Sequence, residues 1–298
     1  MNLSAAQIEK TFQVWKYYIE NGVTFLNNRG EFNDAELDQK RLQLIPEIQA
    51  LLFRYHRGDL ELSSFKTKLD SLNKKNRLWG FMAINGQMFF NMVVKSSQSG
   101  NKTQELNNLL RKVMLIPPSI NEVQKRIQEF EEFVRDLGQF SSDPRGAPKV
   151  GSIPYFLSYL WQIQDPEKYP IYYTSMVQAF KSLDIWSPSK NAITDYVEFF
   201  DLNYLLVEKL SQKYNRKIKL WDVEHAFWLQ FKIITKKTSN TSILPVLDFP
   251  QPVDQITEPV VMTLPESYVP PIVSVLPMMA KNDPEMIHLC RQSGRAIE

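Results

Sequence analysis

Apolar residues recur every three or four positions along most of the chain, the spacing of helices with one buried face. Ser4 is placed to cap the first helix, and Ile8, Phe12 and Trp15 follow on one side. The same pattern predicts further helices at 33–58, 63–73, 78–94, 103–115, 119–137, 153–163, 174–183, 191–214 and 222–234. Strand-like character is confined to 218–221 and the run beginning at Pro170, so the sequence predicts a mainly α, multi-helix globular domain with little strand.

Two of these helices contain residues that disfavour a regular helix. Pro46 lies inside the second one, and because proline removes a backbone donor, we expect that helix to kink or to start later than its apolar pattern indicates. Gly80 and Gly86 interrupt the apolar segment 78–94. Two glycines there indicate either close backbone packing or a break between two shorter helices.

The composition divides the chain into four parts. Residues 1–140 are expected to form an N-terminal helical subdomain, and residues 151–237 an aromatic-rich helical subdomain packed on it, with a polar hinge loop between them. Residues 238–271 are rich in proline and acidic residues, lack basic ones, and read as a linker or a strap. Residues 272–298 predict a short helical segment with Pro284 in its first turn. This segment either leads into a further domain beyond this polypeptide or docks as a C-terminal helix.

Aromatic residues are densest between Gly151 and Phe180, on either side of a Pro-Glu-Lys-Tyr-Pro turn, and Trp186 follows shortly after. The block comprises Tyr155, Phe156, Tyr159, Trp161, Tyr169, Tyr172, Tyr173, Phe180 and Trp186. Such a set either fills a core or lines a pocket or interface for something flat, such as a nucleobase. Because two short helices and a turn cannot present every ring in one direction, some of them must be core.

The overall composition excludes several classes of protein. The 298 residues contain 35 Lys and Arg against 33 Asp and Glu, so no global basic field marks a nucleic-acid binder and any such surface must be local. The single cysteine, Cys290, excludes an internal disulfide framework and fits a reducing compartment. The sequence has no signal peptide and no apolar run near the ~20 residues that span a bilayer, which predicts a cytoplasmic protein without membrane partners.

The search for catalytic chemistry is negative. The chain lacks phosphate-binding glycine loops, and His56, His225 and His288 are too far apart in sequence to indicate a metal site, so we predict no catalytic residues, cofactor or metal. Glu224 and His225 form the most suggestive pair, but Asp222 before them favours a capped helix N-terminus. Cys290 reads as a small apolar helix residue rather than a nucleophile.

Two clusters of basic residues indicate a local anionic partner. The first comprises Lys66, Lys68, Lys74, Lys75 and Arg77, and the second Lys213, Arg216, Lys217 and Lys219. Clusters of this kind bind backbone phosphates, although cations near helix C-termini also complement the helix dipole. We predict phosphate contacts from Lys74, Lys75, Arg77, Lys217 and Lys219, and base stacking on Trp161, Tyr172 and Tyr173. If the aromatic block is a pocket, Gln162, Gln164 and Asp165 would supply hydrogen bonds to a base edge.

Three strings of the sequence resemble a known class of protein. The strings LWGFMAINGQMFFNMVVK, GSIPYFLSYLWQIQDPEKYPIYYTSMVQAF and KLWDVEHAFW, between Leu78 and Trp228, look like the N-terminal helical region of bacterial multidomain defence proteins. In those proteins a recognition module precedes a McrB-like AAA+ motor or a restriction-endonuclease-like nuclease. YPIYYTSMVQAF is also similar to the segment bearing the catalytic aspartate of helix-hairpin-helix DNA glycosylases, but Tyr173 and Thr174 stand where that acid belongs, which argues against base excision.

The sequence therefore predicts a DNA-recognition or sensor module of a bacterial anti-phage or restriction system. Its partners would be DNA, modified or single-stranded DNA included, and an effector domain or subunit that supplies any nuclease or NTPase activity. One alternative is a protein-interaction scaffold or self-association module with an aromatic docking rim. Another is an enzyme with an unfamiliar site, whose turnover would disappear on substitution of Glu224 or His225.

Overall fold

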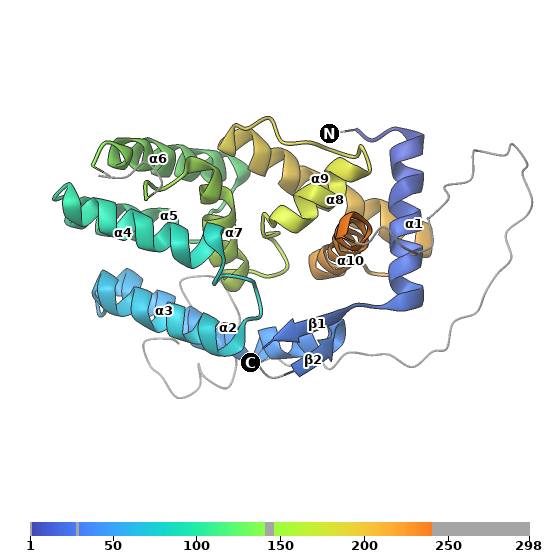
Figure 1. The fold of residues 1–298 in the computed structure, drawn as a ribbon, viewed down its shortest axis with the longest axis horizontal. Helices are drawn as coiled ribbons and strands as arrows, with labels where there is room; N and C mark the ends of the chain where they lie inside the picture. The colour runs from blue at the N-terminus through green and yellow to red at the C-terminus, as the bar shows by residue number, and fades with distance from the viewer. Residues whose placement is uncertain (1, 28–29, 141–145, 240–298) are drawn as a thin grey trace, which may run out of the picture. The chain divides into compact units, whose positions relative to one another are not determined.

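The computed structural model describes residues 2–27, 30–140 and 146–239. These residues form ten α-helices, one π-helix, one short 3-10 helix and a two-stranded hairpin (Figure 1). The α-helices are α1 (Ala5–Asn21), α2 (Asp34–Arg57), α3 (Leu62–Asn76), α4 (Phe89–Ser99), α5 (Thr103–Val113), α6 (Ile120–Gly138), α7 (Ile153–Gln164), α8 (Thr174–Ser182), α9 (Ala192–Tyr214) and α10 (Leu220–Ser239). The predicted mainly α fold is therefore confirmed.

Local capping sets the helix boundaries that the sequence predicted. The Ser4 hydroxyl accepts a hydrogen bond from the backbone N–H of Gln7, whose side chain accepts one from the N–H of Ser4. Asn33 and Glu36 repeat this reciprocal capping at the start of α2. Gly58 ends α2 in the left-handed conformation, with φ +88°, which glycine adopts without steric cost.

The segment 78–94 is not the single helix that its apolar pattern indicated. A turn containing Gly80, with φ +63°, leads into the π-helix η1 (Ile84–Met88), and only then does α4 begin. A Cβ atom at Gly86 would lie 2.1 Å from the carbonyl oxygen of Phe81, so the backbone passes too close for any side chain. The close backbone packing indicated by the glycines is confirmed at Gly86, whereas residues 78–83 form a turn rather than the first of two shorter helices.

Pro46 and the strands show where local patterns misled. α2 starts at Asp34 and contains Pro46, so of the two effects expected of this proline, a kink or a later start, the later start does not occur. The two runs with strand-like character, at 218–221 and after Pro170, do not form strands in these described segments. Instead, β1 (Thr24–Asn27) pairs with β2 (Gly30–Asn33) in an antiparallel hairpin, with Thr24 opposite Asn33.

The aromatic block fills the core around α7, which packs against α2, α6, α9 and η1. Seven members are at most 8% exposed: Tyr155, Phe156, Tyr159, Trp161, Tyr169, Phe180 and Trp186. Their polar tips have partners, because the Tyr155 hydroxyl donates to the carbonyl oxygen of Trp79 at 2.7 Å and the Trp161 indole to that of Val113 at 3.0 Å. For these seven residues the core interpretation is confirmed, whereas Tyr172 and Tyr173 are half-buried.

The helices on the two sides of the predicted hinge loop belong to one compact unit, Met1–Leu244. α10 packs against α1, α8 and α9, while α2 packs against α3 and α7 (Figure 1). α10 extends to Ser239, and the rest of the predicted linker and the segment 272–298 lie outside the described residues. None of the helices in the described part of the chain is long and apolar enough to cross a membrane.

Candidate functional site: the Arg41 junction between α2 and α10

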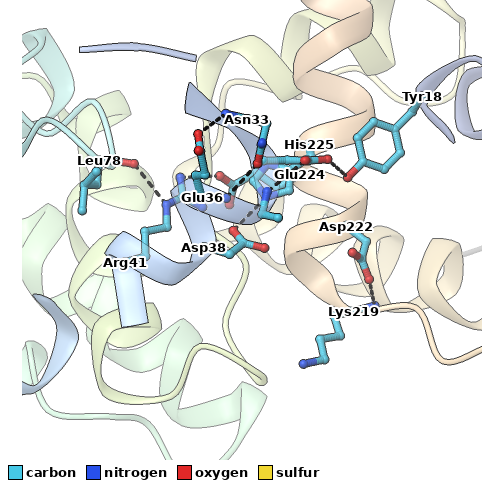
Figure 2. A network of polar contacts seen from close by, with 12 residues as sticks. Tyr18, Asn33, Glu36, Asp38, Arg41, Leu78, Lys219, Asp222, Glu224 and His225 are labelled. Carbon is cyan, nitrogen blue, oxygen red and sulfur yellow. Dashed lines mark hydrogen bonds and ion pairs between the residues drawn. The ribbon is translucent and has the colours of Figure 1, made fainter. Parts of the chain in front are cut away.

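A buried arginine joins two helices that are far apart in the sequence. Arg41 of α2 places its Nη2 atom 2.7 Å from Oε1 of Glu224 in α10, and its Nε donates to the carbonyl oxygen of Leu78 at 3.1 Å (Figure 2). The side chains of Arg41 and Glu224 are only 3% and 8% exposed. We call this contact, with the residues that surround it, the Arg41 junction.

Two tryptophans flank the Arg41 guanidinium. Its carbon lies 5.6 Å from the ring of Trp79 and 5.4 Å from that of Trp221, within the range of cation–π attraction. Burial by itself lowers the pKa of Arg41, but the Glu224 carboxylate raises it, and the net result is a pKa above the usual arginine value. Arg41 is therefore a permanent buried cation with one carboxylate partner.

A second pair of side chains links the same two helices. Nε2 of His225 lies 2.8 Å from Oδ1 of Asp38, one turn before Arg41 in α2 (Figure 2). The His225 side chain is 1% exposed, and the ring of Phe25 from the hairpin covers it at a centroid distance of 5.4 Å. The hydroxyl of Tyr18 donates to Asp34 at 2.5 Å and ties α1 to the start of α2.

Asp222 has a capping role at the start of α10. Its carboxylate accepts a hydrogen bond from the backbone N–H of Lys219 at 2.7 Å, at the N-terminus of α10. Burial raises the pKa of Asp222, and this hydrogen bond partly opposes the shift. Asp222 therefore lies at a helix N-terminus as expected, but α10 begins two residues earlier than predicted and Asp222 is its third residue rather than its N-cap. Glu224 and His225 also bind across to α2.

Sequence reasoning did not identify Arg41 as a site residue. A signal was present, because Arg41 falls four residues after Leu37 and three before Leu44, on the stripe that α2 buries. A charged residue on the apolar face of a helix needs a buried partner. The partner could not be read from the sequence, because Glu224 lies 183 positions away.

The five predicted phosphate-binding residues are all exposed. Lys74, Lys75 and Arg77 lie at the C-terminal end of α3, and Lys217 and Lys219 precede α10. No ion pair is formed by any of the five within the described residues.

Both basic clusters adjoin the Arg41 junction along the chain. Leu78, whose carbonyl oxygen accepts from Arg41, directly follows Arg77. Trp221, whose ring lies against Arg41, comes two residues after Lys219. Other members of the clusters are engaged elsewhere: Lys66 pairs with Asp70 at 2.5 Å, and Lys213 and Arg216 lie over aromatic rings of α1.

The three predicted stacking residues are distributed differently. Trp161 is 0% exposed, so its ring offers no free face. Tyr172 packs its ring against Phe199 at a centroid distance of 5.0 Å. The Tyr173 hydroxyl accepts from Nη2 of Arg41 at 3.4 Å, which makes Tyr173 the member of the three that contacts the Arg41 junction.

The amides that were candidates for reading a base edge are enclosed as well. Gln162 is 1% exposed, and the side-chain nitrogen of Gln164 donates to the carbonyl oxygens of Met114 and Leu160. Among the described residues, no group of three or more His, Cys, Asp or Glu side chains is arranged to hold a metal ion.

Comparison with known proteins gives no match: no family model fits the chain, and no curated protein or solved structure is significantly similar to it. The resemblance of residues 78–228 to defence proteins therefore stays a prediction.

Proposed function

We propose that this chain is a DNA-recognition or sensor module that holds DNA phosphates at the two basic clusters beside the Arg41 junction. The observation that carries the proposal is the set of five exposed cations without ion-pair partners in the described part of the chain: Lys74, Lys75, Arg77, Lys217 and Lys219. Clusters of unpaired cations on a nearly neutral protein form local phosphate-binding surfaces.

The helix dipole accounts for the positions of the cations in the first basic cluster but not for that of Lys219 in the second. Lys74 and Lys75 lie in the last turn of α3, where a cation is favourable beside the carbonyl groups. Lys219 lies at the N-terminus of α10, where the dipole is positive and a cation is unfavourable. An anionic ligand removes this repulsion, so Lys219 favours a phosphate-binding role over simple helix capping.

The biological setting of this binding follows from the resemblance of residues 78–228 to recognition modules of bacterial defence proteins. We propose that the chain senses DNA for an anti-phage or restriction system, and that an effector, a nuclease or an AAA+ motor, is joined beyond the Pro-rich segment or supplied by a partner. Single-stranded, duplex and base-modified DNA are the ligands to compare first.

The test is a binding series with these three kinds of DNA at several salt concentrations. We expect log K to fall linearly with log salt, and the triple variant K74Q/K75Q/R77Q and the double variant K217Q/K219Q each to reduce the slope by about 0.7–0.9 per lost phosphate contact. Lys125→Gln, at an exposed lysine of α6 away from both clusters, is the matched control and should keep the wild-type slope. Absence of binding to every DNA tested would sink the proposal.

A second candidate function, a protein-interaction scaffold, is favoured by one specific observation. Ile84 and Met88 of η1 are 63% and 48% exposed, which is unusual for large apolar residues so close together on one short segment. Binding through this surface would be nearly insensitive to salt. Light scattering of the wild type and of the variant I84S/M88S tests this second function, because self-association through η1 should be lost in the variant.

A further inference from the structure

We propose that the first turn of α10, together with Arg41, Trp79 and Trp221, forms a buried binding site for a phosphate-type oxyanion. This inference deepens the proposed function, because a DNA strand is one source of such a phosphate and a free phosphate compound is the other.

Three buried hydrogen-bond donors of the Arg41 junction have no acceptor within the described residues. They are Nη1 of Arg41, Nε1 of Trp79 and Nε1 of Trp221. The residues are 2%, 2% and 8% exposed, so solvent cannot satisfy these donors. A buried donor without an acceptor costs about 1–3 kcal/mol, and three around one guanidinium are a large deficit for a native protein.

The partners that Arg41 does have leave one edge of its guanidinium free. Leu78 accepts from Nε, and Glu224 and Tyr173 accept from Nη2, so none of the three protein acceptors is bound by Nη1. The free Nη1 atom belongs to a cation flanked by two indole rings, each of which also has an unused N–H. An arginine with one free edge can donate to an oxyanion without giving up its carboxylate partner.

The N-terminus of α10 adds a favourable field at the same place. Trp221 is the second residue of this 20-residue helix and Glu224 the fifth, so the contacts of Arg41 hold its guanidinium beside the first turn. The first backbone N–H groups of a helix lack partners within the helix and attract anions. Asp222 caps the N–H of Lys219, which lies before the helix.

The chemistry of the free groups selects the ligand. A buried water bonds to a mixture of donors and acceptors, whereas the three free groups of Arg41, Trp79 and Trp221 are all donors. The other free atom nearby in the described residues, Nδ1 of His225, belongs to the neighbouring pair with Asp38. An oxyanion accepts only, and phosphate oxygens can accept from several N–H groups at once. The nearby carboxylates are already engaged, Asp38 with His225 and Asp222 with Lys219. Arg77 and Lys219, each within two residues of a junction residue along the chain, are exposed and attract anions to this part of the protein.

The experiment uses the full chain and variants that remove a single indole N–H. Trp79→Phe and Trp221→Phe keep an aromatic ring beside Arg41 but lose the donor. Trp186→Phe is the matched control, because the Trp186 indole already donates to Glu198 at 2.8 Å. The melting temperature is followed while inorganic phosphate replaces chloride at constant ionic strength, and in a second arm while a short oligonucleotide is added.

We expect phosphate or the oligonucleotide to raise the melting temperature of the wild type and of Trp186→Phe. In Trp79→Phe and Trp221→Phe, the concentration needed for the same rise should increase at least tenfold. A response to inorganic phosphate identifies free phosphate compounds as a source, and a response to the oligonucleotide alone identifies the DNA strand. No response to either probe, or an equal response in all four proteins, overturns the site and indicates buried water at the three donors.

The experiments distinguish failure of the buried oxyanion site from failure of the proposed DNA-recognition function. Glutamine variants of the exposed lysines should weaken DNA binding. They should leave the rise in melting temperature with inorganic phosphate unchanged, because those lysines are not among the buried donors. If DNA binds with the predicted salt slope but the indole variants behave as wild type, only the buried site is wrong. If phosphate binds at the junction and no DNA binds anywhere, the proposed function fails and the oxyanion site stands.

Discussion

The aromatic core around α7 and the Arg41 junction are both buried, but their polar groups are satisfied to different degrees. Around α7, Tyr155, Tyr159 and Trp161 each direct a polar tip to a partner inside the protein. At the junction, Arg41, Trp79 and Trp221 each keep a buried donor without a partner in the described residues. A packed core explains the aromatic side chains of the first region, where the buried amide of Gln162 is the α7 group whose side-chain nitrogen and oxygen lack partners among the described residues. The second region has unused hydrogen-bonding capacity, and that capacity points to a ligand.

The same comparison shows that the most prominent feature of the sequence is not the region where unused hydrogen-bond donors cluster in the structure. The aromatic block is the densest feature of the chain, yet seven of its members serve the core. Arg41 is inconspicuous among the Lys and Arg residues, yet it connects α2, α10 and the turn at Leu78. Residue density alone is therefore a poor guide to a functional site here.

The largest effect is expected from truncating the centre of the aromatic core. Phe156 is 0% exposed and its ring lies 5.1–6.3 Å from those of Phe81, Phe89, Phe90 and Phe130. Phe156→Ala should lower the free energy of unfolding by about 4 kcal/mol, because it removes buried apolar area and leaves a cavity. Urea unfolding followed by circular dichroism measures this change.

The matched control for this substitution is Phe53→Ala in α2, where the side chain is 38% exposed. Phe53→Ala should lower the free energy of unfolding by less than about 1 kcal/mol. If the two variants were equally destabilised, the region around α7 would not be the main packed core, and the contrast with the junction would fail.

A smaller but different effect is expected at the junction. Glu224→Gln leaves Arg41 as a buried cation without a carboxylate, which should cost about 3 kcal/mol in the free energy of unfolding. The double variant Arg41→Met with Glu224→Leu removes both charges and should recover most of that loss, because buried ion pairs are replaceable by apolar residues of similar size. Urea unfolding of Arg41→Met, Glu224→Leu and the double variant completes the cycle.

Recovery in the double variant would show that the junction contributes little to stability as an ion pair, which sharpens its contrast with the core. A double variant as unstable as the sum of the two single variants would contradict this. Packing of the Arg41 and Glu224 stems would then explain the cost, and the junction would resemble the aromatic core after all.

Most helices were predictable from the sequence because their signals are local. Caps such as Ser4 and Asn33 act within four residues, and glycines such as Gly58 set the backbone at one position. The hairpin was missed because its strands are four residues each and its rings meet distant partners: Phe25 stacks on Trp228 at a centroid distance of 4.5 Å. Tertiary contacts of this kind leave no local pattern.

The candidate site was only partly predictable, for the same reason. The exposed lysines were identified because a charge cluster is visible in the sequence itself. The burial of Arg41, and the donors left unused around it, depend on how α10 packs against α2, which periodicity does not specify. Glu224 and His225 were noticed as a pair, but their partners Arg41 and Asp38 come from the other half of the chain.

The smallest effect is expected at Asp222, where burial raises the pKa of the carboxyl group. Between the unfolded and folded pKa values, the folded protein binds more protons than the unfolded one, so this residue destabilises the protein as pH rises through that window and fully so at pH 7. Asp222→Asn keeps a side-chain oxygen that can accept from the backbone N–H of Lys219, and it removes the buried charge. We expect the variant to be more stable than wild type at pH 7, by less than about 1 kcal/mol, with the advantage fading as pH falls toward 4.

Asp222→Ala removes the cap as well and should be less stable than Asp222→Asn by about 1 kcal/mol at both pH values. Thermal unfolding of the three proteins at pH 7 and pH 4.5 makes the measurement. An advantage of Asp222→Asn that grows at low pH would reverse the sign argued here, and would mean that Asp222 stabilises the α10 N-terminus mainly through its charge.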